Sequence, residues 1–276
     1  MKSEFFDLQP TADTTQFSWT PDSRLLTPAN SLQGGAALGA ALTTMEKVTG
    51  RPTIWATAQY LSFALHTEPI DIAVAVEVGG HNTSQARCVM SRDGREILTA
   101  HAAFGSRPME HAGVWSVRPD VPGPDDCARY KFFETGRGHL GDLLEMRLAL
   151  GRQLADLDGQ HGSGTSAFWI RAGAGTRRVS AAELAFVGDL MPLGFADAIG
   201  HAFAGNSLDN TVRVGDLVDT EWVLLVCHIQ QVVNGFGYGY GDLWAQDGTL
   251  LGQVSQSSVM RMHKHIKALG EQAPDA

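Results

Sequence analysis

The hairpin between Gly235 and Arg261 contains the residues whose types and spacing say most about chemistry. Glycines alternate with aromatic residues from Gly235 to Gly241, so one face of this strand carries only glycines. Glycine weakens a strand unless something approaches its backbone closely, and we therefore expect a helix or a long thin ligand against that face. The next strand places a polar residue, Gln256, on the same face as Val254. The Gln256 amide can donate and accept hydrogen bonds, which makes it a candidate site residue, although a polar break in a half-buried strand is the alternative.

A helix start supplies the second group of candidates, Gly34 and Gly35. Residues 33–48 are small or apolar almost throughout, with large apolar residues at helical spacing, which predicts a helix buried on most sides. We expect Asn30 or Ser31 to cap its start. Backbone N–H groups at a helix start have no partner within the helix and can bind an oxyanion, and glycine permits close approach. Close helix packing is the competing explanation for both glycines.

An antiparallel sheet must position these residues. After the first helix the pattern predicts four strands, at about 53–63, 70–79, 83–91 and 95–104. The second half repeats this order, with a helix at about 181–204, broken or kinked at Pro192 and Gly194, and strands at about 209–215, 222–233, 235–245 and 249–260. A shift of 154 residues aligns Thr57 with Thr211, and it aligns the turn Asp93-Gly94 with the turn Asp247-Gly248. An internal repeat of this length indicates a duplicated domain.

A long apolar helix wrapped by four or five antiparallel strands describes the hotdog architecture. The predicted fold class is therefore α+β: a tandem double hotdog, with two antiparallel sheets joined into one and each wrapped round a long helix. We expect an N-terminal hotdog at 1–105, a linker at 106–140, a C-terminal hotdog at 141–265 and a disordered tail at 266–276. Apolar surface left on the paired sheets predicts a homodimer or a higher even homo-oligomer.

Composition argues against several classes of function. The chain of 276 residues has a net charge of −9, which disfavours non-specific binding to nucleic acid or to an anionic membrane. Arg177-Arg178 can still bind an anionic ligand locally, although a solvated loop pair is the favoured interpretation. The three cysteines, Cys88, Cys127 and Cys227, show neither metal-ligand nor disulfide spacing. No signal-peptide core and no apolar run of about 18 residues occurs, so we expect a reduced cytoplasmic protein without a membrane span, a metal or a cofactor.

A chain of landmarks over about residues 30–262 resembles the acyl-CoA thioesterase II family and the wider thioesterase-like superfamily of double hotdogs. The resembling segments are 206–211, 220–225, 244–251 and 255–261 in the second half, and 33–35, 93–95 and 103–104 in the first. The resemblance implies an acyl-CoA substrate whose thioester is hydrolysed to a free acid and CoA. It further implies a water molecule held by an Asp, a Thr and a Gln.

The resemblance also assigns roles to numbered residues. The Asp is matched to Asp209 and the Gln to Gln256, whereas the position of the Thr is filled by Gln230. Asp209 would orient the water and accept its proton, and Gln256 or Gln230 would position that water. His228 lies on the same strand face as Gln230 and is a possible neighbour of the site. The free N–H groups at the first helix start would meet the oxyanion.

Each assignment has a structural alternative. Asp209 can be a turn or strand-end residue, and His228 can be a core histidine with satisfied hydrogen bonds. For the whole chain, the missing Thr leaves open a non-catalytic acyl-CoA-binding or scaffolding hotdog protein with a degenerate site. A hotdog hydratase or dehydratase is weaker, because no suitably placed His–Asp pair occurs at a helix start.

Overall fold

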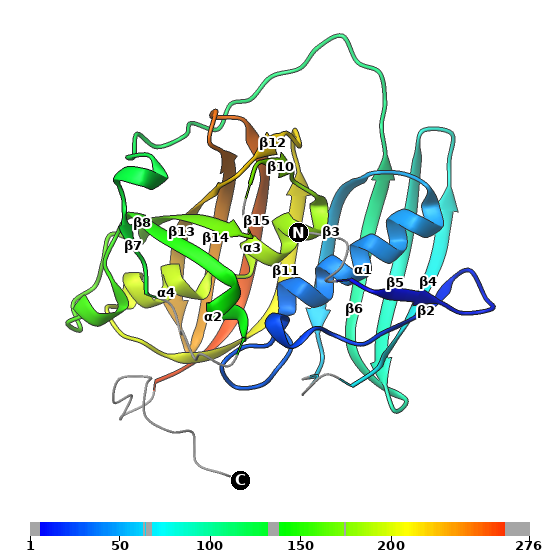
Figure 1. Cartoon of the computed structure of the whole chain (residues 1–276), viewed down its shortest axis with the longest axis horizontal. Helices are drawn as coiled ribbons and strands as arrows, with labels where there is room; N and C mark the ends of the chain where they lie inside the picture. Colours follow the sequence, from blue (N-terminus) through cyan, green and yellow to red (C-terminus); the bar gives the residue numbers. More distant parts are fainter. Residues whose placement is uncertain (1–5, 63, 65–67, 132–137, 174, 263–276) are drawn as a thin grey trace.

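One helix and a large antiparallel sheet organise the first half of the molecule. Helix α1 (Gly34–Thr49) is buried along most of its length, as expected for a helix built from small and apolar residues. It lies across one face of the sheet (Figure 1). The computed structural model describes residues 6–62, 64, 68–131, 138–173 and 175–262.

The start of α1 is capped by Gln33 and by neither Asn30 nor Ser31, so that expectation was wrong. The side-chain oxygen Oε1 of Gln33 accepts from the N–H of Ala36 at 2.6 Å. Asn30 instead occupies a turn with a positive φ of 57°, too far upstream to reach the first free N–H groups.

Thirteen strands form one sheet in the described part of the chain, and all neighbours pair antiparallel. The first half contributes, in spatial order, β1 (Leu8–Pro10), β2 (Gln16–Trp19), β4 (Ile70–Gly79), β5 (Thr83–Arg92), β6 (Arg95–Gly105) and β3 (Thr53–Tyr60). The second half continues with β11 (Ala204–Val214), β15 (Leu250–Arg261), β14 (Phe236–Ala245), β13 (Val223–Val233), β9 (Thr165–Ala172), β8 (Leu144–Leu150) and β7 (Ala128–Arg129). The predicted antiparallel sheet, continuous through both halves, is confirmed.

The two halves join where β3 pairs with β11. Thr57 lies opposite Thr211 in this pairing, and their hydroxyl oxygens are 2.8 Å apart. These are the residues that the internal repeat aligns, so a pseudo-twofold axis passes between them. The two copies of the duplicated unit are therefore joined through equivalent strands.

The helical segment of the second half is divided into α3 (Ala181–Gly188) and α4 (Pro192–Ile199), with a turn between them. The sequence predicted that the helix over 181–204 would be either kinked or broken at Pro192 and Gly194, and the structure shows a break. Pro192 has no N–H to continue the α3 ladder and its ring excludes the preceding helical carbonyl, so it begins a new helix instead. The turn leaves Asp189 at the end of α3, on the side facing α1.

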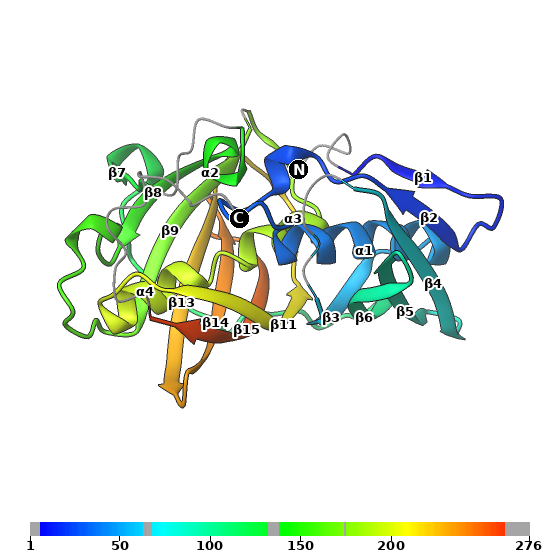
Figure 2. The same cartoon turned by 90° about the horizontal axis from the view of Figure 1, so that it is seen from below.

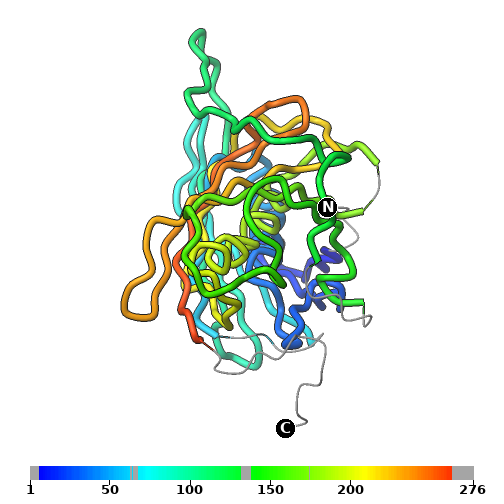
Figure 3. The backbone as a smooth tube through the Cα atoms, turned by 90° about the vertical axis from the view of Figure 1, so that its left-hand side faces the viewer, coloured from blue at the N-terminus to red at the C-terminus, as the bar shows by residue number. Residues whose placement is uncertain are grey.

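The glycine face of β14 packs against α4. A Cβ atom on Gly237 would lie 2.7 Å from the ring of Phe195, and one on Gly241 would lie 3.2 Å from the Met191 side chain in the turn before α4. The element expected against this face is thus a helix. All three long helices lie on the same side of the sheet (Figure 2), whereas the tip of the β13–β14 hairpin projects away from them (Figure 3).

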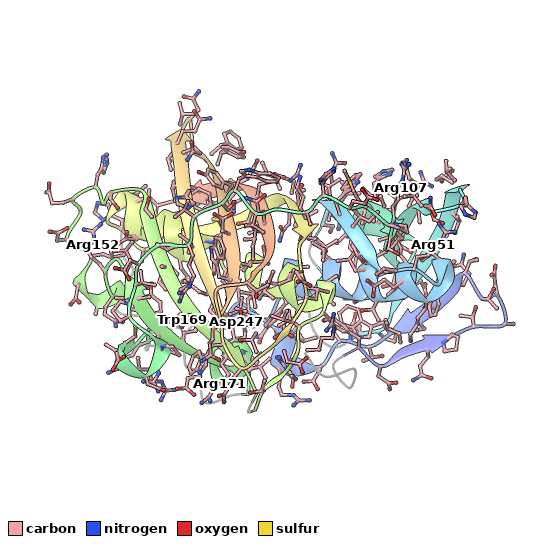
Figure 4. The ribbon with its side chains drawn as sticks, turned by 90° about the horizontal axis from the view of Figure 1, so that it is seen from above. Arg51, Arg107, Arg152, Trp169, Arg171 and Asp247 are labelled. Atoms are coloured by element: carbon pink, nitrogen blue, oxygen red, sulfur yellow. The ribbon has the colours of Figure 1, made fainter. Side chains whose placement is uncertain are left out.

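The opposite face of the second half is partly covered by the chain that connects the halves. The connection leaves β6 near Arg107 and crosses above the sheet toward Trp169 (Figure 4). The indole Nε1 of Trp169 donates to the carbonyl of Pro122 at 2.9 Å. Residues Val121 and Cys127 then pack on a small second apolar cluster there.

The remaining described elements are short. They are the helix α2 (Leu140–Leu143), the 3-10 helices η2 (Ser23–Leu25), η3 (Pro124–Asp126) and η4 (Leu154–Asp156), and the strand pair β10 (Arg177–Arg178) and β12 (Asp219–Thr220). No described helix combines the length and apolar character that crossing a bilayer requires. The end of the C-terminal hotdog after residue 262 and the tail at 266–276 lie outside the described residues.

Candidate active site

A buried carboxylate, Asp189, stands at the turn between α3 and α4. Its exposed fraction is 8%. Oδ1 accepts from the hydroxyl of Ser207 at 3.0 Å and from the side-chain amide of Gln256. Oδ2 accepts from the backbone N–H of Gly35 at 2.8 Å. Groups from three other parts of the chain therefore converge on one carboxylate.

Ser207 and Gln256 also contact one another. Gln256 Nε2 donates to Ser207 Oγ at 2.9 Å, and its Oε1 accepts from Ser258 Oγ at 3.3 Å. Gln256 is 1% exposed, and it is held on the inner face of β15 beside β11. A carboxylate, a hydroxyl and an amide thus form a closed triangle, which is a set of groups that can hold one water molecule by both donors and acceptors.

A β-bulge brings Ser207 to this triangle. The register of β11 against β15 shifts between Ser207 and Asp209, which leaves Leu208 as the extra residue. Because of that insertion, Ser207 and Asn210 both face the helices although they are three positions apart. Regular alternation from Asn210 would have turned Ser207 outward.

Burial governs the ionisation of Asp189. Removal from water raises the pKa of the Asp189 carboxyl to about 6, and hydrogen bonds from Gly35, Ser207, Gln256 and Gly34 act in the opposite direction. The two glycines stand at the N-terminus of α1, where the helix dipole also favours an anion. A carboxylate with this pKa is largely ionised at neutral pH and yet basic enough to take a proton from water.

Gly35 makes this arrangement possible through close packing. A Cβ atom on Gly35 would lie 2.3 Å from the carbonyl oxygen of Ala185 and 2.7 Å from Cβ of Asp189. No real Cβ tolerates such contacts, so only glycine lets the start of α1 touch the end of α3. Gln33 adds a tie between the helices, since its Nε2 donates to the carbonyl of Phe186 at 3.0 Å.

Residues 124–260 match the family model described as the acyl-CoA thioesterase C-terminal domain. Residues 124–260 belong to the acyl-CoA thioesterase family. This assignment confirms the resemblance found in the sequence and places the chain among the thioester hydrolases. The sequence matches no protein of curated function.

Solved structures share the fold over almost the whole chain. A candidate thioesterase from Novosphingobium aromaticivorans is 29% identical, with a TM-score of 0.82 over 92% of this chain and 98% of that one. A hot dog fold protein from Alicyclobacillus acidocaldarius is 21% identical, with a TM-score of 0.80 over 95% and 98%. An acyl-CoA thioesterase II from Mycobacterium marinum is 19% identical, with a TM-score of 0.73 over 95% and 98%. The double-hotdog fold is therefore confirmed.

The structure brings together only some of the residues selected from the sequence. Gln256 and Gly35 both donate to Asp189, and Gly34 lies beside them. The N–H of Gly35 is engaged by the carboxylate, so the oxyanion role suggested for the helix start stays a prediction. Gly34 packs closely as well, because a Cβ there would lie 2.9 Å from the ring of Tyr60.

Asp209 does not reach the triangle, and its place there is taken by Asp189. Alternation with the inward-facing Asn210 places Asp209 on the outer face of the sheet, where Oδ1 accepts from the backbone N–H of Ser257 at 2.9 Å. That bond satisfies an amide beside the bulge, which is a structural task. Ser207, on the same strand as Asp209, places a hydroxyl at the Asp189 carboxylate, and Gln230 does not reach it.

Gln230 and His228 lie away from the triangle on β13. Gln230 is exposed at a second bulge, between Ile229 and Gln231. The ring of His228 stacks on Tyr240 with centroids 4.8 Å apart, on the outer face of the hairpin. Neither side chain contacts Asp189 or Gln256 in the described structure.

Other candidate features of the sequence have structural roles. Arg177 donates to the buried carboxylate of Glu183 and to the carbonyl of Ala172, so its guanidinium ties β10 to its surroundings. Cys88 and Cys227 are fully buried, as expected for small apolar residues, and burial raises the pKa of each thiol to about 12. Within the described ranges, no group of three or more His, Cys, Asp or Glu side chains is placed to hold a metal ion.

Two shallow surface hollows of about 390 and 380 Å³ lie away from Asp189. The first opens on the outer face at the pseudo-twofold axis and is lined by Trp55, Thr57, Thr211 and Arg213. The site around Asp189 is instead enclosed between α1, α3 and the inner face of the sheet, which excludes bulk water from the carboxylate.

Proposed function

We propose that the protein is an acyl-CoA thioesterase in which Asp189, Ser207 and Gln256 hold the water that attacks the thioester. The observation that carries the proposal is the buried Asp189 carboxylate, with a hydroxyl and an amide both bonded to Oδ1. The family match over residues 124–260 supports thioester hydrolysis as the reaction.

The chemistry follows from the bonding capacity of these groups. A water that enters between Asp189 and Gln256 would take the place of the hydrogen bond between them: it donates to the Asp189 carboxylate and accepts from the freed Gln256 N–H, while the second N–H stays on Ser207 Oγ. Asp189 takes one proton from the water as its oxygen attacks the thioester carbonyl carbon. The tetrahedral intermediate then collapses, the C–S bond breaks, and the departing CoA sulfur takes up a proton while the free acid remains.

The pKa of about 6 makes Asp189 suited to this work. At neutral pH roughly nine tenths of the molecules carry the ionised form, and the protonated form is accessible after each proton transfer. Because the base must be ionised, kcat is expected to rise as the pH passes through about 6. No covalent intermediate is required.

Ser207 supplies a hydroxyl of the same chemical type as the missing Thr at the carboxylate, and this disfavours a degenerate, non-catalytic site. Asp209 keeps the structural role described above.

The direct test is CoA release from a panel of acyl-CoAs, from acetyl-CoA to palmitoyl-CoA. The wild-type protein should release free CoA thiol from at least one chain-length class. Gln256→Leu keeps the volume of the side chain but cannot bond water, and it should lower kcat by roughly 10- to 100-fold. If acyl-CoA binds without any release of CoA, the protein is an acyl-CoA-binding module and the proposal is wrong.

A further inference from the structure

A second polar pair lies beside the Asp189 triangle on the inner face of the sheet. Asn210 of β11 pairs with Gln256 of β15 on one side and with Ala58 of β3 on the other. Tyr60 lies two residues beyond Ala58 on the same face of β3. Its ring stands against Gly34 at the start of α1. Gln256, Asn210 and Tyr60 therefore follow one another along the inner face of the sheet, from the proposed water site to the Tyr60 phenol.

The Asn210 side chain and the Tyr60 hydroxyl are buried, and neither has a hydrogen bond to any other described residue. Asn210 is fully buried, and neither its Nδ2 nor its Oδ1 has a hydrogen-bond partner among the described residues. The buried hydroxyl of Tyr60 is also without a partner there. Buried polar groups are almost always satisfied, because leaving one unpaired costs free energy. The Tyr60 hydroxyl and Asn210 Oδ1 can pair with one another, which leaves the Asn210 Nδ2 group as a buried donor for a further partner.

The pseudo-twofold repeat shows that the fold does not need these polar groups. The position equivalent to Asn210 in the first half is Ala56, which is also fully buried, and the position equivalent to Tyr60 in the second half is Val214. The proposed water site also occurs in only one of the two repeats, since the residue equivalent to Asp189 in the first half is Gly35. The polar residues thus gather at one of two equivalent places, as expected if they serve a ligand and not the architecture.

The Tyr60 phenol remains a hydrogen-bond donor at this place. Burial, followed by the negative charge of Asp189, holds the pKa of Tyr60 far above its usual range, while the nearby Asn210 amide acts in the opposite direction. The phenol is therefore protonated at any pH at which the enzyme would work. It can donate to Oδ1 of Asn210 and so turn Nδ2 toward the substrate.

We propose that Asn210 Nδ2 donates a hydrogen bond to the thioester carbonyl oxygen and to the oxyanion that forms from it, with Tyr60 as its positioning residue. This inference rests on the proposed thioesterase function. An oxyanion needs donors, and the N–H of Gly35 already bonds to Asp189. Asn210 stands next to Gln256, so a carbonyl held there lies beside the proposed water.

Kinetics of single variants test the proposal. Asn210→Ala should lower kcat by roughly 10²- to 10³-fold, the usual cost of removing one oxyanion donor, with a much smaller change in KM. The midpoint of the kcat–pH profile should stay where Asp189 sets it. Tyr60→Phe keeps the ring against Gly34 and should cost less, and the double variant should be no slower than Asn210→Ala. Gln59→Ala, which removes the exposed outward-facing neighbour of Tyr60, is the matched control.

A spectroscopic measurement separates polarisation of the carbonyl from a structural effect. An acyl-CoA labelled with carbon-13 at its carbonyl is bound to the Asp189→Asn protein, and its C=O stretch is compared with that in Asp189→Asn/Asn210→Ala and in Asp189→Asn/Tyr60→Phe. The stretch should rise when Asn210 is removed, and by less when only the Tyr60 hydroxyl is removed.

The outcomes are distinguishable. Equal kcat for wild type and Asn210→Ala, or an unchanged C=O stretch, overturns the role of Asn210 while hydrolysis by the wild type keeps the proposed function. Failure of the wild type to release CoA overturns the proposed function itself. If Asn210→Ala does not fold, the proposal is tested with Tyr60→Phe. A lowered kcat together with a raised C=O stretch in that variant supports the proposal, and an unchanged kcat and stretch contradict it.

Discussion

Replacing Asp189 by asparagine should be more favourable for stability at neutral and higher pH than in acid. The asparagine side chain would keep the size of the aspartate and remove the buried charge. The pKa of Asp189 is about 6 in the folded protein against 3.8 for an ordinary Asp, a difference of about two units. At about 1.4 kcal/mol for each unit, ionisation costs the folded state about 3 kcal/mol relative to the unfolded chain.

The sign of the effect follows from the raised pKa. Below about pH 4 the carboxyl is protonated in both states, and its ionisation costs nothing. Between about pH 4 and 6 the unfolded chain ionises first, so stability is lost, and above about pH 6 the full cost is present. The asparagine variant lacks this cost. The difference in unfolding free energy between Asp189→Asn and wild type should therefore grow by about 3 kcal/mol from about pH 4 to pH 8.

Urea denaturation at both pH values measures this difference directly. Any constant effect of altered hydrogen bonding with Gly35 or Ser207 cancels, because only the change between the two pH values is compared. Asp209→Asn serves as the control for loss of a carboxylate outside the buried site, and its difference should change much less. A difference for Asp189→Asn that is the same at both pH values would show that burial of the carboxylate costs the folded state nothing.

Three further predictions concern the site and the assembly. Ser207→Ala should lower kcat by roughly 10- to 100-fold, whereas Ser207→Thr keeps the hydroxyl and should stay within a few-fold of wild type. CoA release measures both variants, and an equal loss of kcat in the two would contradict the role of the hydroxyl. Gly35→Ala should destabilise the protein by about 1–3 kcal/mol in denaturant and lower kcat, because the new methyl would meet the Ala185 carbonyl; a fully stable and active variant would refute the close helix contact. The exposed apolar side chains Val232, Val233 and Phe236 on the projecting hairpin favour a homodimer or a higher even assembly, which light scattering at micromolar concentration should detect; a monomer would contradict it.

Local sequence patterns predicted the main helices and most of the long strands. Period-2 alternation and turn residues gave the four strands after α1 and the four after α4, with bounds within a few residues at most ends. The alternating glycines of β14 predicted a close-packed element on that face, and α4 fills this role. The repeat predicted that Thr57 and Thr211 are equivalent, and the two meet across β3 and β11. These features depend on residues close together in the chain, so they can be predicted from the sequence alone.

The site depends on interactions between distant residues, and there the residues chosen from the sequence differ from those that the structure brings together. One extra residue at Leu208 reverses the facing of the residues before it, so Ser207 turns inward, whereas Asp209 alternates with the inward-facing Asn210 and faces outward. That register is set by pairing with β15, which the β11 sequence does not contain. One signal was available: Asp189 is the only charged residue between Leu184 and Leu193, and a lone carboxylate in a buried apolar run needs partners.

The most direct test of the account compares two aspartates in one assay. CoA release by Asp189→Ala and by Asp209→Ala should be measured side by side, at a saturating concentration of an acyl-CoA that the wild type hydrolyses. If Asp189 is the base, Asp189→Ala should lose roughly two to three orders of magnitude in kcat, while folded Asp209→Ala stays within about tenfold of wild type. An Asp189→Ala protein that hydrolyses acyl-CoA as fast as wild type, with the loss found in Asp209→Ala instead, would contradict the account.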